Sequence, residues 1–398
     1  MLVAATGVGT GEIATGSFAG SLLGNAILWA VLVGAFLKYV ITEGLARWQL
    51  ATGTTILEGA ADNLGKGAVY IFLPYLLLWT FFTASALMSA CGIAFHAMFP
   101  LFDNPVKGKI VFGIAASLVG TLLVYKGGFR LFEKIMTACI VLMFFTVVTT
   151  AVLLWPGTDE VLRGIFVPRI PDADGAGLTW TVALIGGVGG TVTVLSYGYW
   201  IREEGRSGGD DLRICRIDLA TGYLMTAVFS MSMVIVGSNL EISGSGASLI
   251  VDISERLAEP LGVFGKWLFL IGAAGTVFSS LLGTWQATPY FFADSWQLLR
   301  ERGDAQRVIA DTDAPAYRGY LIALAVVPML GLFFDFRQVQ KFYAFTGAFF
   351  VPMLAVVLLV LNGRSRWVGQ QFRNGPVTFV SLAAALAFFL WVAASKIF

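Results

Sequence analysis

Long apolar stretches, separated by short polar segments, run through the whole chain. A helix needs about 20 mostly apolar residues to cross a bilayer, and eleven stretches are of this kind. The chain shows no strand-like alternation that competes with this interpretation. The predicted spans are Met1–Ser21, which is short and broken, Gly24–Thr42, Gly67–Phe99, Lys109–Tyr125, Phe132–Trp155, Leu178–Ile201, Ile217–Gly237, Val263–Trp296, Ala316–Phe334, Val339–Leu361 and Pro376–Ile397.

Two of these spans are interrupted by clusters of glycine, at residues 7–12 and at residues 186–191. Clustered glycine lets the backbone leave the helix. A break inside hydrocarbon survives only where protein or a watery cavity lines its unpaired peptide groups. Paired breaks in two halves of one chain indicate the substrate site of a transporter built from inverted repeats. The alternative for each cluster is close helix packing of the Gly-xxx-Gly kind. Unwound backbone is expected at Gly7, Gly11, Gly187 and Gly189.

The spacing of the two breaks predicts how the chain is organised. The second break follows the first by five spans, so spans one to five and six to ten form two halves. An odd number of spans per half makes the halves antiparallel in the membrane. We therefore expect one transmembrane domain over residues 1–398, with repeats at 1–155 and 178–361 and an accessory helix at 376–397.

Composition and charge place the chain in a membrane. Hydrophobic residues make up 57% of it and charged residues 13%, whereas soluble domains carry about 25% charge. We expect an integral protein of a lipid bilayer, and the net charge of +1 gives no reason to expect a nucleic-acid partner. An excess of Lys and Arg in alternate loops predicts a cytoplasmic N-terminus. Short loops fit a bacterial inner membrane, and nothing in the sequence indicates an oligomeric state.

Four short motifs occur in a fixed order along the chain. They are Thr6-Gly-Val-Gly-Thr-Gly-Glu-Ile-Ala-Thr15, Ala51-Thr-Gly-Thr54, Gly189-Gly-Thr-Val192, and Asn362, Gly369 and Asn374 before the last span. In this order they resemble the Nramp family of divalent-metal transporters, whose first segment carries Asp-Pro-Gly-Asn followed by Phe-Ala-Thr. The resemblance covers all eleven spans. It implies an all-α membrane protein with a LeuT-type 5+5 inverted repeat, in which helices 1 and 6 are unwound around the site.

The chain departs from this family at the residues that carry its metal chemistry. In this alignment the metal-binding Asp becomes Gly9, the Asn becomes Glu12 and the soft Met ligand becomes Thr193. The acidic pair that serves proton movement falls on Ala86 and Ser89. The resemblance therefore implies a divergent branch without proton coupling, similar to the magnesium-transporting relatives that also lack the thioether.

The groups expected at the site present only oxygen. Carboxylate, hydroxyl, carbonyl and water suit Mg²⁺, Ca²⁺ and Mn²⁺, and Mg²⁺ usually keeps several of its waters. We expect Glu12 and Thr193 to contact a partly hydrated Mg²⁺ or Mn²⁺ as transported ion, with no bound cofactor. The full predicted substrate-binding set is Gly9, Thr10, Glu12, Gly190, Thr193 and Tyr197.

Some polar residues in the spans admit two interpretations. An acidic residue at the midplane is costly and indicates function, but Glu12 also opens a half-helix, where a carboxylate caps free N–H groups. Thr193, Ser196, Tyr197 and Trp200 share one helical face, which either lines an inner exit or packs against other helices.

Three charged residues lie near the inner end of the second span. Glu43 and Arg47 are one turn apart, so we expect them to pair. Lys38 lies a turn further in, and its long side chain is expected to snorkel toward the interface.

Three functions follow from these observations. The favoured one is a secondary transporter or facilitator that carries a divalent cation by alternating access around Glu12 and the two breaks. The second is the same fold carrying an anion or small zwitterion, such as bicarbonate or an amino acid, because half-helix N-termini attract negative groups. The third is a non-transporting sensor, which predicts no flux. No Walker motif or nucleophile elbow appears, which disfavours ATP-driven transport and an enzyme.

Overall fold

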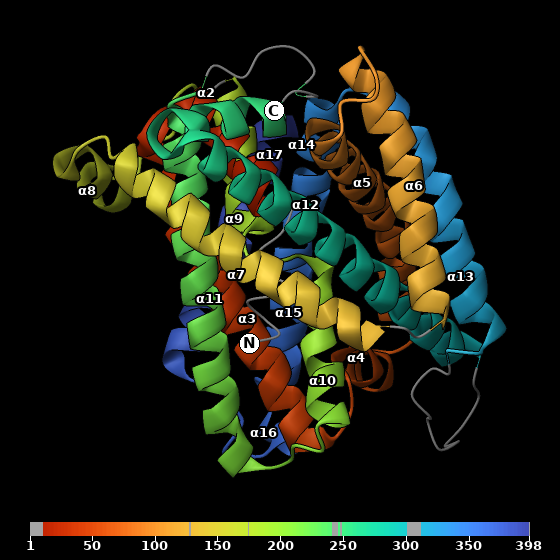
Figure 1. Ribbon diagram of the computed structural model, residues 1–398. Helices are drawn as coiled ribbons and strands as arrows, with labels where there is room; N and C mark the ends of the chain where they lie inside the picture. Colours follow the sequence, from red (N-terminus) through yellow and green to blue (C-terminus); the bar gives the residue numbers. More distant parts are fainter. Residues whose placement is uncertain are drawn as a thin grey trace.

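The computed structural model describes residues 11–126, 129–173, 175–240, 246, 249–300 and 312–397. Helices account for the regular structure, and the described ranges contain no strand (Figure 1). The N-terminal half consists of the π-helix η1 (Gly11–Thr15), α2 (Gly16–Leu23), the 3-10 helix η2 (Gly24–Ile27), α3 (Leu28–Thr52), α4 (Ile56–Leu64), α5 (Gly67–Met98), α6 (Pro105–Lys126), α7 (Phe129–Leu153) and α8 (Thr158–Phe166).

The C-terminal half contains a broken helix, a long kinked helix and several shorter ones. Its elements are α9 (Ala176–Gly187), η3 (Val192–Leu195), α10 (Ser196–Glu203), α11 (Gly209–Ser238), α12 (Leu249–Arg300), α13 (Pro315–Val326), η4 (Val327–Phe333), α14 (Phe336–Ala348), α15 (Phe350–Leu361), α16 (Ser365–Val368) and α17 (Pro376–Ile397). The predicted last span has the bounds of α17, and the other predicted spans from the second to the tenth all overlap helices.

Within the described residues, nine helical stretches are long and apolar enough to cross a membrane. The number is ten if Ile140–Leu153 and Thr158–Phe166, which are bent by 114°, form one span. The first of the nine is Glu12–Thr52, which covers most of the first two predicted spans. The predicted total of eleven stays a prediction.

The chain reverses direction inside this first stretch, at Gly24, which has φ 62°. Along α2 the chain runs parallel to α11, and at its end Ser21 Oγ donates to the Leu240 carbonyl at 2.6 Å. Along α3 it returns in the opposite direction, where Thr42 Oγ1 lies 2.7 Å from the Tyr223 hydroxyl of α11. α2 and α3 are therefore two antiparallel segments joined by a tight turn.

The helices form two groups that meet at α7 and α14. In the first group, α11 packs against α2 and α3, and α3 packs against α9. In the second, α5 packs against α6 and α12, and α12 also packs against α13. α7 contacts α11 and α12, and α14 contacts α9 and α5. Figure 1 shows α5, α6 and α13 side by side, with α7 and α12 crossing the front of the molecule.

Small residues allow the closest of these helix contacts. A Cβ at Gly20 of α2 would lie 2.2 Å from the Val234 carbonyl oxygen of α11. Only a residue without a side chain permits this approach, as in other membrane bundles. The contact holds α2, and η1 directly before it, firmly against α11.

Candidate functional site

The second glycine cluster breaks a helix in the middle of the molecule. α9 ends at Gly187, Val188 leaves the helix with ψ 130°, and a 3-10 turn begins at Val192. Gly189 and Gly190 have φ 77° and 85°, the left-handed region that favours glycine. The predicted break is thus present at residues 188–191, and Gly187, expected to be unwound, is the last residue of α9.

Another glycine of this cluster serves close packing instead. A Cβ at Gly186 would lie 2.2 Å from Ala348 Cβ of α14. Likewise, a Cβ at Gly347 would lie 2.5 Å from Thr191 Cγ2. Both interpretations of the glycine cluster therefore apply, each to different residues. Gly189 and Gly190 permit the unwound conformation, while Gly186 permits contact between α9 and α14.

Glu12 connects the first helical segment to this break. It lies in the π-helix η1 and is 4% exposed, and its Oε1 accepts a hydrogen bond from the Gly189 N–H at 2.9 Å. A single-turn π-helix is rare and often marks a functional position. Gly11 is the first residue of η1. Gly7, Gly9 and Thr10, and with them the rest of the first break, lie outside the described residues.

Lys38 does not snorkel, so that expectation was wrong. Its side chain is 1% exposed, and its Nζ donates to the carbonyl of Gly186 at 2.7 Å and to the carbonyl of Gly190. The charges of Lys38 and Glu12 also interact. The end of α9 leaves carbonyls without helical partners, and these buried oxygens satisfy an ammonium in place of water.

A small pocket, with room for about one water molecule, adjoins the break on the side of α10. Thr193, Tyr197 and Trp200 of the predicted polar face line it, whereas Ser196 does not. The remaining lining residues are Thr42, Gly189, Val194 and Tyr223. Three of the predicted face residues therefore border open space. Tyr223 and Thr42, which hydrogen-bond each other, were not identified from the sequence because a polar residue in a span carries no signal of which cavity it faces.

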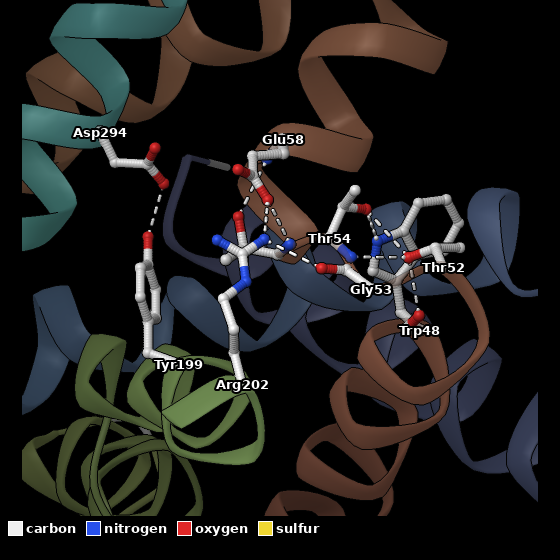
Figure 2. A network of polar contacts seen from close by, with 9 residues as sticks. Trp48, Thr52, Gly53, Thr54, Glu58, Tyr199, Arg202 and Asp294 are labelled. Atoms are coloured by element: carbon white, nitrogen blue, oxygen red, sulfur yellow. Dashed lines mark hydrogen bonds and ion pairs between the residues drawn. The ribbon is translucent and has the colours of Figure 1, made fainter. Parts of the chain in front are cut away.

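A polar network closes the structure beyond this pocket, at the end where α3 and α10 terminate (Figure 2). Arg202 of α10 donates to Glu58 Oε2 at 2.7 Å and to the Gly53 carbonyl at 3.0 Å. One turn back, the Tyr199 hydroxyl donates to Asp294 Oδ2 of α12 at 2.6 Å. These contacts tie α10 to α4, to the end of α3 and to α12.

The expected pair of Glu43 and Arg47 is confirmed, with Nε 2.7 Å from Oε2. Arg216 of α11 bonds the other oxygen of Glu43 at 2.8 Å, so the carboxylate joins α3 to α11. Arg47 also donates to Asn374 Oδ1 at 3.0 Å, and Asn362 Nδ2 donates to the Gly44 carbonyl at 2.8 Å. The asparagines of the last sequence motif thus fasten the α15–α17 region to α3.

The described residues do not provide the ligand set of a dehydrated metal ion. No three His, Cys, Asp or Glu side chains come close enough together there to hold one. Ala86 and Ser89, which the resemblance aligns with an acidic pair, are both fully buried on α5.

Known proteins match the chain over its whole length. The family model "Natural resistance-associated macrophage protein-like" (Nramp) matches residues 1–398. The divalent metal cation transporter MntH of Chromohalobacter salexigens is 24% identical over 302 residues, which cover 71% of this chain and 67% of that protein.

Solved structures with the same arrangement of helices include a mutant of the Eremococcus coleocola manganese transporter. It matches with a TM-score of 0.70 at 17% identity, over 97% of this chain and 82% of that one. MhsT in complex with L-phenylalanine matches with a TM-score of 0.64 at 13% identity, over 97% of both chains. At these identities the likeness concerns the fold, and it confirms the predicted LeuT-type architecture.

Proposed function

This chain belongs to the Nramp family, and from that premise we propose that it is a secondary transporter that carries a divalent cation across the break between α9 and α10. Relatives are integral membrane transporters named for divalent metal cations. One observation carries the proposal for this chain. The carbonyls of Gly186 and Gly190 accept hydrogen bonds from the Lys38 ammonium, and the Glu12 carboxylate accepts one from the N–H of Gly189, which lies between them. Carbonyls that already accept an ammonium support the proposal that a cation binds at this break.

The donor atoms favour Mg²⁺ or Mn²⁺ in partly hydrated form. Every candidate ligand, from the Glu12 carboxylate to the Thr193 hydroxyl and the break carbonyls, is oxygen, which suits these hard ions. One carboxylate with several retained waters is a common environment of Mg²⁺. The pocket beside the break holds about one water molecule in this state, so a partly hydrated ion requires the pocket to widen.

Alternating access would proceed by movement of α10. The pocket lies between the break and the Arg202–Glu58 network, so release of this network opens a path from the site. We propose that this end faces the cytoplasm of a bacterial cell, with the protein in the inner membrane, because Lys and Arg are enriched in its loops.

The driving force we propose is the membrane potential, without proton coupling. Ala86 and Ser89 cannot carry protons in the way that a pair of acids does. A divalent ion gains about 4.6 kcal/mol per 100 mV, twice the value for a single charge.

Uptake by proteoliposomes tests this function. We expect saturable uptake of Mn²⁺ or Mg²⁺ above that of empty liposomes, and uptake that falls at least tenfold in Glu12→Gln. A wild-type protein that moves none of Mg²⁺, Mn²⁺ and Ca²⁺ would contradict the proposal. If binding of one of these ions persists without any flux, the protein is a sensor.

A second candidate is transport of an anion or a small zwitterion. The observation that favours it is the buried Lys38 side chain, whose Nζ donates to the carbonyls of Gly186 and Gly190 and, in its charged form, would balance the charge of Glu12. A substrate carboxylate or bicarbonate would then use the ammonium as its partner. A thermal-shift screen separates the two candidates, because this one predicts stabilisation by carboxylates, bicarbonate or amino acids and none by Mn²⁺.

A further inference from the structure

We propose that Lys38 is a resident cation of the transport site: its ammonium occupies the carbonyls that the transported ion uses, and the ion binds by displacing it. The inference rests on the proposed transport of a divalent cation. It assigns to Lys38 the role of an internal competitor that sets the affinity of the site.

The geometry of the break supports this assignment. Gly186 lies in the last turn of α9 and Gly190 lies within the break, so the two carbonyls that Lys38 contacts come from both sides of Gly189. An ammonium is a compact point charge with three donors. Two of its N–H groups donate to the carbonyl oxygens of Gly186 and Gly190, so the ammonium occupies the position that a small cation bound to both oxygens would occupy.

The charges do not permit both occupants at once. A divalent ion at these carbonyls would stand beside a positively charged group, in a buried region where charge interactions are weakly screened. Glu12 supplies one negative charge at Gly189, which does not neutralise a divalent ion and an ammonium together. The ammonium must therefore leave the carbonyls as the ion arrives.

The structure also offers the ammonium another position. Lys38 and Thr42 lie one helical turn apart on α3, and Thr42 lines the pocket together with Tyr223. The Lys38 side chain already passes Gly189, where a Cβ would lie 3.6 Å from its Cγ. The hydroxyls of Thr42 and Tyr223 are acceptors that the displaced ammonium reaches by rotating its flexible stem.

Removing the internal competitor tests the proposal. We expect Lys38→Met to bind Mn²⁺ with a dissociation constant at least tenfold lower than that of the wild type, measured by titration calorimetry of the purified protein. The matched control is Lys109→Met, because Lys109 is also buried, on α6, and donates to the Phe334 carbonyl at 2.6 Å. The control should leave Mn²⁺ affinity unchanged. If Lys38→Met binds Mn²⁺ no more tightly than the wild type, the proposal is overturned. It is also overturned if the wild type binds bicarbonate and Lys38→Met does not.

Chemical rescue gives a second measurement that does not depend on transport. Lys38→Ala removes the side chain beyond Cβ, and n-propylammonium has the shape and charge of the missing part. We expect this amine to raise the melting temperature of Lys38→Ala saturably, and Mn²⁺ to compete with it. Neutral n-propanol should have no such effect, and Lys109→Ala should not respond to the amine. If n-propylammonium does not stabilise Lys38→Ala, the resident-cation proposal is overturned even if Mn²⁺ uptake is observed. If the amine stabilises this variant but the wild type shows no Mn²⁺ uptake, Lys38 is a cation of the site and the proposed transport function is contradicted.

Discussion

The Glu12 carboxylate accepts a hydrogen bond from the backbone N–H of Gly189, a residue 177 positions further along the chain. Lys38 donates to the carbonyls on either side of the same glycine. A carboxylate thus satisfies an N–H group of the break and an ammonium satisfies its carbonyls. This arrangement meets the requirement that peptide groups at membrane depth find partners within the protein.

Replacement of Glu12 by Gln should distinguish a role of the carboxylate in ion binding from a role limited to its hydrogen bond with the Gly189 N–H. The amide oxygen can still accept from the Gly189 N–H, but Lys38 loses its counter-charge, so we expect the variant to fold with a lower melting temperature. The negative charge is lost, and a charge-assisted bond contributes about 1.5–3 kcal/mol. Mn²⁺ affinity should therefore fall about tenfold or more. Unchanged uptake in this variant would mean that Glu12 only caps η1.

Alanine substitutions across the glycine cluster should have unequal effects. Gly189→Ala and Gly190→Ala force a side chain into the left-handed region, at a cost of about 1–2 kcal/mol each. At Gly189 the new Cβ would also lie 2.6 Å from the Tyr223 ring, so this variant should be the less stable one. Gly187→Ala is the matched control, because Gly187 is helical and a Cβ there meets nothing within 4 Å. Thermal unfolding measures the difference, and equal destabilisation by all three would argue against the unwound conformation.

Loss of the Arg202–Glu58 ion pair should open the pocket. The pair is largely buried and also holds the Gly53 carbonyl, so Arg202→Gln should favour the open state by about 1–2 kcal/mol, a factor of about 5–30. A cysteine introduced at Thr193, with the three native cysteines replaced, should react correspondingly faster with a water-soluble thiol reagent. Arg213→Gln, at an exposed residue of α11, is the control. Equal labelling rates in both variants would mean that this network does not close the site.

Uptake should respond to the membrane potential and not to a pH gradient. At 100 mV, inside negative, about 4.6 kcal/mol per divalent ion allows an accumulation on the order of 10³-fold. Proteoliposomes with a potassium diffusion potential, with and without an imposed pH difference, provide the measurement. Stimulation by the pH gradient at a fixed potential would show that protons are coupled by groups other than Ala86 and Ser89.

The positions of most membrane helices were predictable from apolar length, since the predicted spans from the second to the eleventh overlap helices and α17 and the start of α5 agree with the expected bounds. Three short helices were not predicted. α4 and α8 have only nine residues each and an amphipathic pattern, and α16 has only four residues. The sequence does contain a signal for α4, because Thr55 and Glu58 form a capping box.

The site itself was only partly predictable. The sequence showed a charged Lys38 inside a span, but the direction of its side chain depends on carbonyls 148 positions away. In the same way, the sequence could not show which glycines of the cluster allow unwinding and which allow close packing. That depends on Ala348 and Tyr223, which contact the cluster only in the folded protein. The sequence pattern identifies a charged residue or a glycine cluster inside a span, but contacts with residues distant in the sequence determine its structural role.

The contact between Gly186 and Ala348 has a mechanical consequence. Because Gly186 has no side chain, the Cβ of Ala348 packs directly against the backbone of α9, and this close packing resists movement of α9 relative to α14. α10, on the other side of the break, is fastened largely by polar contacts that water can replace. The movement of α10 that we propose would therefore rotate the backbone at Gly189 and Gly190, the two positive-φ glycines that separate α10 from the fixed helix α9.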